Sequence, residues 1–197
     1  MFSSSPTSSS WWLSAACLLL LSTATAADPT DGFTAVKLDE SNFVLQKPYD
    51  VQGSSRYSFD GTVRRLWVFS SDKPHKPQSK TNPRTEIRMT VFGASDVKTT
   101  LMLHVYDGDL RYYDRKVVEP NIYDHWFRLN VIHDIGRSEL VLFINGHERL
   151  RVAGHGGDRH YFKFGVYEQR RPSERMESRW RDVRILKKNK QLIEMDI

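Results

Sequence analysis

The stretch LVLFINGHERLRV, Leu140 to Val152, carries the strongest fold signal in the chain. Apolar residues flank an Asn-Gly pair, which favours the two-residue turn of a β-hairpin because both positions accept positive φ angles. Two further stretches repeat the pattern around Asp-Gly pairs, YSFDGTVRRLWVF (57–69) and LMLHVYDGDLRYY (101–113). These hairpin signals predict a protein built mainly of antiparallel strands.

The remaining sequence also reads as strands and loops. WFRLNVIHD (126–134) predicts a long strand that pairs with Glu139 to Ile144, and ESRWRDVRILKK (177–188) predicts a closing strand. The polar, proline-containing stretch KPHKPQSKTNP (73–83) predicts a loop. No stretch keeps a helical period over more than a turn or two. We therefore expect an all-β fold, a sandwich or jelly roll.

The N-terminal segment has the features of a signal peptide. Residues 1–27 carry no charged side chain, and Trp11 to Leu21 form an apolar core followed by Ala24 and Ala26, spaced for cleavage. The basic residues usual before such a core are absent, which leaves an uncleaved anchor as the alternative, although the run is short for a membrane span. We expect a secreted or vacuolar protein with one domain, residues 28–188, and a C-terminal tail, residues 189–197.

Composition narrows the function classes. The only cysteine, Cys17, lies in the signal segment, so the mature chain forms no disulfide. The net charge of +5 is dispersed among acidic residues, which argues against a nucleic-acid partner and favours anionic ligands in general. The histidines lack metal-ligand spacing. We expect no metal, no cofactor and, after cleavage, no membrane contact.

PRTEIRM, Pro83 to Met89, alternates strictly, which places Arg84, Glu86 and Arg88 on one face of a predicted strand. One interpretation is a solvated ion-pair ladder of small energetic value. The other is a carboxylate-binding surface, because the planar guanidinium fork grips a carboxylate through two hydrogen bonds.

HYFKFGVYEQ, His160 to Gln169, alternates in the same way. The pattern places two sets of residues on opposite faces: Phe162, Phe164 and Val166 toward the core, and Tyr161, Lys163, Gly165 and Tyr167 away from it. A cation and two phenols on an open face suit a sugar acid or a small organic acid, and Gly165 leaves room for a ligand near the backbone. The alternative is an ordinary half-buried strand with polar tips at the surface.

Together, RTEIR and YFKFGVY resemble the RTELR-type and YFKAGxY-type motifs of the alginate lyase 2 (polysaccharide lyase 7) family, a jelly-roll family. The wider chain is similar to a plant branch of this family whose members bind citrate. That similarity rests on DPTDGFT, NFVLQKPYDV, PNIYDHWFRLNVIHD, and HYFKFGVY with MESRW behind it. The resemblance covers nearly all of residues 28–188.

The resemblance implies roles for single residues. The first arginine of the lyase motif, here Arg84, neutralises the substrate carboxylate. The motif lysine and tyrosine fall on Lys163 and Tyr167, and the tyrosine acts as the acid/base. The family's third motif, Q-I-H, supplies a glutamine for the carboxyl group and a histidine base, but its best match here is Thr90-Val91-Phe92.

This departure removes the base that β-elimination on a uronate requires. Phe92 cannot accept a proton, and Tyr167 would have to act as a phenolate despite an ordinary pKa of about 10. His104 is the one nearby histidine available to replace the missing base. Carboxylate binding is compatible with these losses, whereas lysis is not expected.

A second departure concerns the chain between the motifs. Arg88 runs through Met89 and Thr90 directly into VFG, so about thirty residues, roughly two central strands with their connections, are missing relative to the family. Such a loss would expose strand edges and part of the core. Either the sheet closes differently, or the sequence is a splice variant or a faulty gene model.

The sequence therefore favours a non-catalytic protein of the secretory pathway that binds citrate or other carboxylates on a concave sheet face. The alternative is a lyase that cleaves a polyuronate, alginate or glucuronan, by β-elimination. A non-functional product of the locus is a third possibility.

Overall fold

The computed structural model describes residues 27–45, 51–72, 89–92, 99–113, 115–155, 160–166 and 173–189. These residues form antiparallel strands with two short 3₁₀ turns, η1 (Glu40–Asn42) and η2 (Gly53–Ser55). The same ranges contain no helix that is long and apolar enough to cross a bilayer. The all-β prediction is confirmed.

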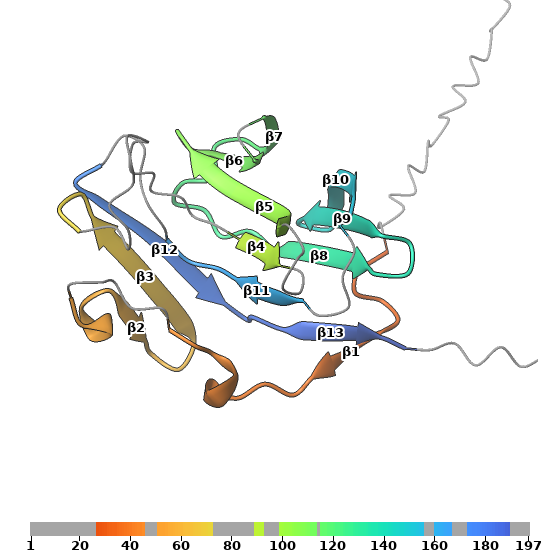
Figure 1. Ribbon diagram of the computed structural model, residues 1–197, viewed down its shortest axis with the longest axis horizontal. Helices are drawn as coiled ribbons and strands as arrows, with labels where there is room; N and C mark the ends of the chain where they lie inside the picture. The colour runs from red at the N-terminus through yellow and green to blue at the C-terminus, as the bar shows by residue number, and fades with distance from the viewer. Residues whose placement is uncertain are drawn as a thin grey trace, which may run out of the picture.

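The strands form four hydrogen-bonded sheets (Figure 1). Their bounds are β1 (Phe33–Val36), β2 (Tyr57–Phe59), β3 (Val63–Phe69), β4 (Met89–Phe92), β5 (Thr99–Tyr106), β6 (Asp109–Tyr112), β7 (Lys116–Glu119), β8 (Leu129–Asp134), β9 (Glu139–Ile144), β10 (His147–Ala153), β11 (Tyr161–Lys163), β12 (Arg175–Arg181) and β13 (Ile185–Lys188). The sheet orders are β11-β4-β5-β6-β7, β10-β9-β8, β12-β3-β2 and β1-β13. The arrangement is a β-sandwich of the jelly-roll type.

The hairpins form where the sequence predicts them. In the β5–β6 turn, Asp107 and Gly108 have φ angles of 51° and 83°, and in the β9–β10 turn Asn145 and Gly146 have 50° and 86°. Positive φ at both central positions is the geometry that matches the strand twist. Strand β8 begins at Leu129, later than Trp126, and pairs with β9 as expected.

The hydrophobic core lies between the five-stranded sheet and the β10-β9-β8 sheet. One face of β5 and one face of β9 supply most of it, with additions from β6, β7 and β10. The buried members are Leu101, Leu103, Val105, Leu110, Val118, Leu140, Leu142, Ile144 and Leu150. Because these residues come from hairpins distant in sequence, the cluster holds the two layers together.

The predicted closing strand is wrong in one respect, because it divides into two. Asp182 adopts a φ of 53°, a left-handed conformation that ends β12. Strand β12 pairs with β3, whereas β13 pairs with β1 in a different sheet. Asn189, the first residue of the predicted tail, donates its backbone N–H to Gly32.

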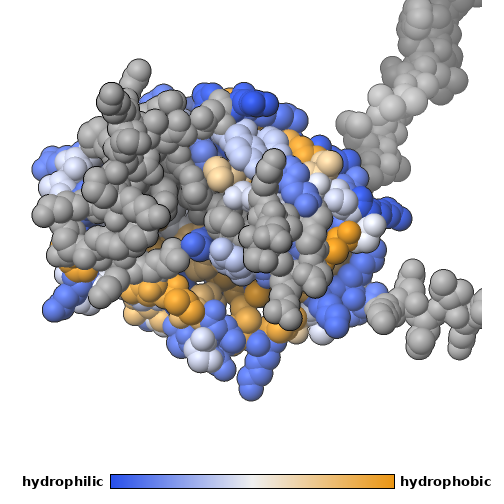
Figure 2. Space-filling model, in the orientation of Figure 1, coloured by the Kyte–Doolittle hydropathy of each residue, from blue (hydrophilic) through white to orange (hydrophobic). Residues whose placement is uncertain are grey.

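Apolar side chains are exposed along the edge of the molecule that β1, β2 and β13 follow. Strands β1, β2 and β13 lie in the lower part of Figure 1, and each exposes a large apolar residue: Val36, Phe59 and Ile185. Figure 2 shows apolar surface gathered in the lower part of the same view. None of these three residues belongs to the buried core cluster.

Arg64 fixes the N-terminal segment to the inner face of β3. Its side chain is 8% exposed, and its guanidinium lies 3.8 Å from the ring centre of Phe43 and 4.1 Å from that of Phe59. It donates hydrogen bonds to both carboxylate oxygens of Glu40 and to the Tyr57 hydroxyl. These contacts raise the pKa of Arg64 above its ordinary value, and the hydrogen bond to Glu40 has the largest effect. A charged side chain therefore occupies a buried position on the inner face of β3, where an apolar side chain is usual.

We expect Arg64→Ala to destabilise the protein by about 2 kcal/mol, because the variant loses two desolvated cation–π contacts and its hydrogen bonds. For a chain of this size the melting temperature should fall by about 4–8 °C. Thermal unfolding followed by circular dichroism measures this. Arg137→Ala is the matched control, because that side chain is 81% exposed in the β8–β9 turn. Equal melting temperatures for the two variants would contradict the role of Arg64.

Candidate functional site

The pairing of β4 brings two predicted motifs side by side. Thr90 of β4 lies opposite Lys163 of β11 on one side and Met102 of β5 on the other. Phe92 of β4 lies opposite Tyr161. The segment that replaces Q-I-H therefore runs directly beside the YFK segment.

The same register shows which face of the sheet carries Lys163. Leu101 and Leu103 belong to the buried cluster, so Met102 between them points away from it. Residues paired across neighbouring strands share a face, which places Lys163 on the side away from the core. Phe162 packs against the core, as predicted. We name the side of the sheet that carries Lys163 and Met102, next to β4, the β4 face.

Lys163 lies beside an exposed aromatic ring at the margin of the β4 face. Its Nζ atom is 5.8 Å from the ring centre of Tyr161, and Tyr161 is 54% exposed. The structure thus places a cation and a phenol from the predicted set within reach of solvent. The other predicted ligand residues, Arg84, Glu86, Arg88 and Tyr167, lie outside the described residues.

His104, the candidate replacement base, is poorly placed for that role. It is 2% exposed and its ring stands perpendicular to that of Tyr106, with centroids 5.6 Å apart. It lies two strands away from Lys163 and two residues further along β5, roughly 12 Å from it by ordinary sheet spacing. A histidine so buried and distant does not serve a ligand held at Lys163.

Gly165 does not provide the predicted space for a ligand. Its φ angle is 138°, and a Cβ atom added there would lie 3.0 Å from Cδ2 of Leu66 on β3. That prediction is wrong, because the Leu66 side chain occupies the space. The glycine permits close packing where the chain leaves β11.

Phe164 joins β11 to the neighbouring layer. Its ring centre is 5.5 Å from that of Phe162, 5.0 Å from Trp180 of β12 and 6.4 Å from Phe43. The predicted inward direction of Phe164 is confirmed. This aromatic cluster stabilises the strand that carries Lys163.

Two histidines meet at the start of β11. The rings of His133 on β8 and His160 are perpendicular, with centroids 4.3 Å apart. Burial lowers the pKa of His133 below its ordinary value, and the neighbouring His160 lowers it further, against a smaller opposite effect of Asp134. The pair favours the neutral form of His133.

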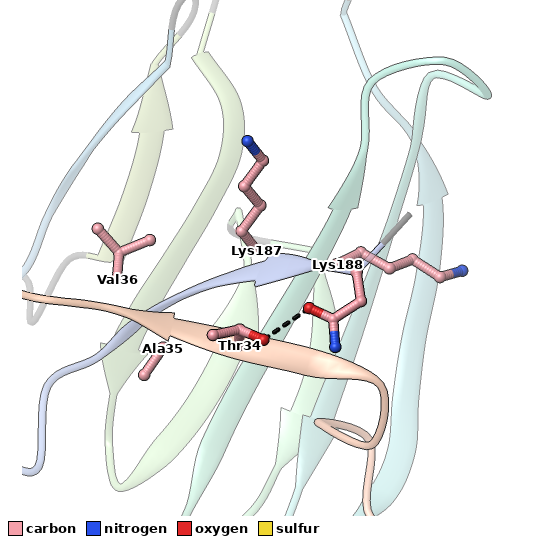
Figure 3. Close-up of a pocket in the computed structure, with 6 residues that line it drawn as sticks. Thr34, Ala35, Val36, Lys187 and Lys188 are labelled. Carbon is pink, nitrogen blue, oxygen red and sulfur yellow. Dashed lines mark hydrogen bonds between the residues drawn. The ribbon is translucent and has the colours of Figure 1, made fainter. Parts of the chain in front are cut away.

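A surface hollow of about 360 Å³ lies at the β1–β13 pair (Figure 3). Thr34, Lys187 and Lys188 help to line it, but the two lysine side chains extend in different directions. None of the predicted site residues lines it. The described residues also contain no group of three or more acidic, histidine or cysteine residues placed to hold a metal ion.

Sequence reasoning missed a second arginine–glutamate–arginine segment. RMESR, Arg175 to Arg179, lies in β12 and has the spacing of RTEIR. Glu177 accepts hydrogen bonds from Arg175 through one carboxylate oxygen and from Arg179 through the other. The alternation of charge was the signal available in the sequence.

We expect Gly165→Ala to lower the free energy of unfolding by about 1–3 kcal/mol, because alanine meets both an unfavourable φ and the Leu66 side chain. Gly136→Ala is the control, since a Cβ there would meet only Asp134 Oδ1 at 3.5 Å. Chemical denaturation of both variants measures the difference. A Gly165→Ala protein as stable as the control would show that Leu66 does not require the glycine.

His133 should make stability depend on pH between about 7 and 5. The folded protein holds the pKa of His133 below its ordinary 6.5, so the unfolded chain binds the proton first as the pH falls. The contribution of His133 to stability is therefore fully present above about pH 6.5, the ordinary pKa, and it is lost progressively as the pH falls below that value. Unfolding midpoints measured across this window should fall less steeply for His133→Gln than for the wild type. Identical slopes would rule out His133 as the cause.

Two comparisons relate the chain to known proteins. A family model described as alginate lyase matches residues 89–187, from the first residue of β4 into β13. A protein of Hevea brasiliensis named citrate-binding protein is 44% identical over 196 residues, which cover 85% of this chain and 82% of that protein. No solved structure matches the chain.

The second comparison also bears on the short connection before β4. The aligned region has 196 positions, whereas 85% of the 197-residue chain is about 167 residues, so about 29 positions have no residue of this chain opposite them. The family match begins at Met89, directly after RTEIR. Both observations accord with a chain that is shorter than its relatives, and the two matches show that the chain belongs to the alginate lyase 2 family.

Proposed function

We propose that this chain binds citrate or a related carboxylate on the β4 face and does not catalyse lysis. The observation that carries the proposal is the pairing of Thr90 with Lys163 and of Phe92 with Tyr161. It places a cation beside the segment in which the family's glutamine and histidine are replaced. The name of the Hevea brasiliensis relative supports a small carboxylate as the ligand.

In this proposal each predicted residue has a role. Arg84 and Arg88 grip carboxylates through paired hydrogen bonds, and Glu86 holds the arginines in place. Lys163 contributes a point charge and Tyr167 a hydroxyl. The basic net charge raises the local concentration of an anionic ligand.

Lysis is the second candidate, because the matching family model is described as alginate lyase. β-Elimination requires a group that removes a proton from the uronate ring. Phe92 offers no such group, and His104 is buried away from Lys163. Tyr167 would be the acid/base if the chain were a lyase.

The proposal includes passage through the secretory pathway. Residues 1–27 would be removed as a signal peptide, and residues 28–188 would act in the apoplast or the vacuolar lumen. Detection of a chain that begins near residue 28 outside the cytosol is the direct test of this part.

Isothermal titration of residues 28–197 with citrate tests the binding role. We expect an affinity that weakens with salt, since the charges are partly exposed. Arg84→Lys should weaken binding about tenfold to a hundredfold, because an ammonium group keeps the charge but loses the fork, at about 1.5–3 kcal/mol for each hydrogen bond. Lys163→Gln should also weaken binding.

Arg115→Lys is the control. Arg115 is exposed in the β6–β7 turn, at the edge of the five-stranded sheet opposite to β11. Its substitution should leave the affinity unchanged. No citrate binding at all, or equal affinity in the wild type and Arg84→Lys, would refute the carboxylate site.

The same protein should release no unsaturated uronate from alginate or glucuronan. Product absorbance measured over a range of pH tests this expectation. The lyase alternative would gain support from activity that Tyr167→Phe abolishes, and the non-catalytic proposal would then be withdrawn.

A further inference from the structure

The β1–β13 pair is a two-stranded ribbon with an open edge at β1. Among the described strands β1 bonds only to β13, and it lies at the lower margin of the molecule in Figure 1. We name these two strands and the residues beside them, 32–37 and 184–189, the β1–β13 ribbon. An edge strand presents backbone N–H and C=O groups to which another strand can bond. The edge of β1 is therefore a place where a further strand can be added.

The register of the ribbon shows which backbone groups of β1 face outward. Asn189 donates its backbone N–H to the carbonyl oxygen of Gly32, which lies directly opposite, so these two residues form a hydrogen-bonded pair. Such pairs alternate along an antiparallel ladder, so Thr34 and Val36 also bond to β13. The N–H and C=O groups of Ala35 then point away from β13. Ala35 is exposed, and no described residue bonds to these two groups.

Two apolar side chains lie together on the outer face of the ribbon. Val36 and Ile185 are directly opposed across the strands and are 44% and 47% exposed. Thr34 and Lys187 share this face, because each lies two residues away along its strand. Leu186, on the opposite face, is half-buried. An apolar side chain of an added strand would cover Val36 and remove part of its surface from water.

Positive charge flanks the apolar pair at both ends of the ribbon. Lys187 and Lys188 lie at the end of β13. Lys37 follows β1 and Arg184 precedes β13, so both lie at the opposite end of the antiparallel pair. All of these basic residues are exposed, and residues 32–37 and 184–189 include no Asp or Glu. In the described part of the chain, no carboxylate lies within ion-pair distance of them. The ribbon thus offers cations to a negatively charged partner.

The hollow at the ribbon gives the side chains of an added strand room. Its volume is about 360 Å³, and its lining includes Thr34, Ala35 and Val36 of β1. Lys187 and Lys188 also line it and extend in different directions from β13 (Figure 3). A strand added beside β1 would lie about 10 Å from β13, two strand spacings away. Because Thr34 between them is small, the side chains of Lys187 and of an acidic residue can together span this distance.

Three kinds of occupant meet these features differently. A second copy of the chain would bring two sets of the same cations together at the edge, which opposes pairing because like charges repel. A lipid surface would attract the cations, but its acyl region offers no hydrogen bond to the outward backbone groups of Ala35. An extended acidic segment of another protein satisfies both the charges and the backbone groups.

We propose that β1 accepts an extended acidic segment of a partner protein as an additional strand. The outward groups of Ala35 bond to the backbone of that segment, an apolar side chain covers Val36, and a carboxylate two residues away pairs with Lys187. Carboxylates elsewhere along the segment meet the other cations of the ribbon. This interaction is separate from citrate binding, because the ribbon and the β4 face belong to different sheets.

The test uses residues 28–197 and a labelled, end-blocked peptide, TETVTETVTE, whose fluorescence anisotropy reports binding at low salt. One face of the extended peptide alternates glutamate with valine. A peptide with lysine in place of glutamate should not bind. Two further peptides carry N-methyl groups on one or the other set of alternate backbone nitrogens. At least one of these should lose binding, because methylation removes the N–H groups that face β1 while the charges remain.

Variants of the protein locate the binding surface. Lys187→Gln/Lys188→Gln should weaken peptide binding about tenfold, because two exposed ion pairs are lost. Ala35→Pro should also weaken it, since proline removes the outward N–H and leaves the bonds to β13. The matched control is Arg115→Gln/Arg137→Gln, which removes the same charge from two exposed turns and should bind within about twofold of the wild type. Thermal unfolding of each variant confirms that it is folded.

Several results would overturn the proposal. If both methylated peptides bind as tightly as the unmethylated one, or if the control double variant loses as much affinity, the surface recognises charge alone. A dimer that Ala35→Pro converts to a monomer would show that a second copy occupies the edge. Binding to phosphatidylserine vesicles without binding to the acidic peptide would identify a lipid surface instead. Lys163→Gln should bind the peptide as the wild type does, which keeps this test separate from that of the citrate site.

Discussion

The site depends on the position of β4, a four-residue strand hydrogen-bonded to β11 on one side and to β5 on the other. Without this double pairing, β11 would have no described neighbour in the sheet, and Lys163 would not lie opposite Thr90. The residues that immediately precede β4 are the predicted carboxylate ligands. Whatever shortened the chain relative to its Hevea brasiliensis relative, the sheet retains a strand at this point.

Much of the fold was predictable because local chemistry determines it. Each Asp-Gly or Asn-Gly pair accepts positive φ at a defined position, and apolar residues beside it bury one face of the hairpin. The core residues Leu101, Leu103 and Leu142 follow from that pattern. The inward directions of Phe162 and Phe164 were predictable for the same reason, since a strand alternates its faces.

The errors arose where distant parts of the chain meet. Gly165 reads as an open position until Leu66 of β3 is placed against it. Asp182 resembles an ordinary strand residue, yet its left-handed φ sends β12 and β13 to different sheets. Arg64 carries no signal of burial in the sequence, yet the rings of Phe43 and Phe59 pack against its guanidinium group. None of these contacts has a signal in the local sequence, because each partner lies on another element.

Binding and catalysis depend on the chemistry of different single positions on one sheet. The β4 face keeps a cation but replaces the family's base, which leaves affinity for an anion without a group to remove a proton. The most direct measurement is the location of bound citrate in crystals of residues 28–197. The account predicts citrate on the β4 face, within hydrogen-bond distance of Lys163 and of an arginine from RTEIR. Citrate found only away from the β4 face, for example at the β1–β13 hollow, would contradict it.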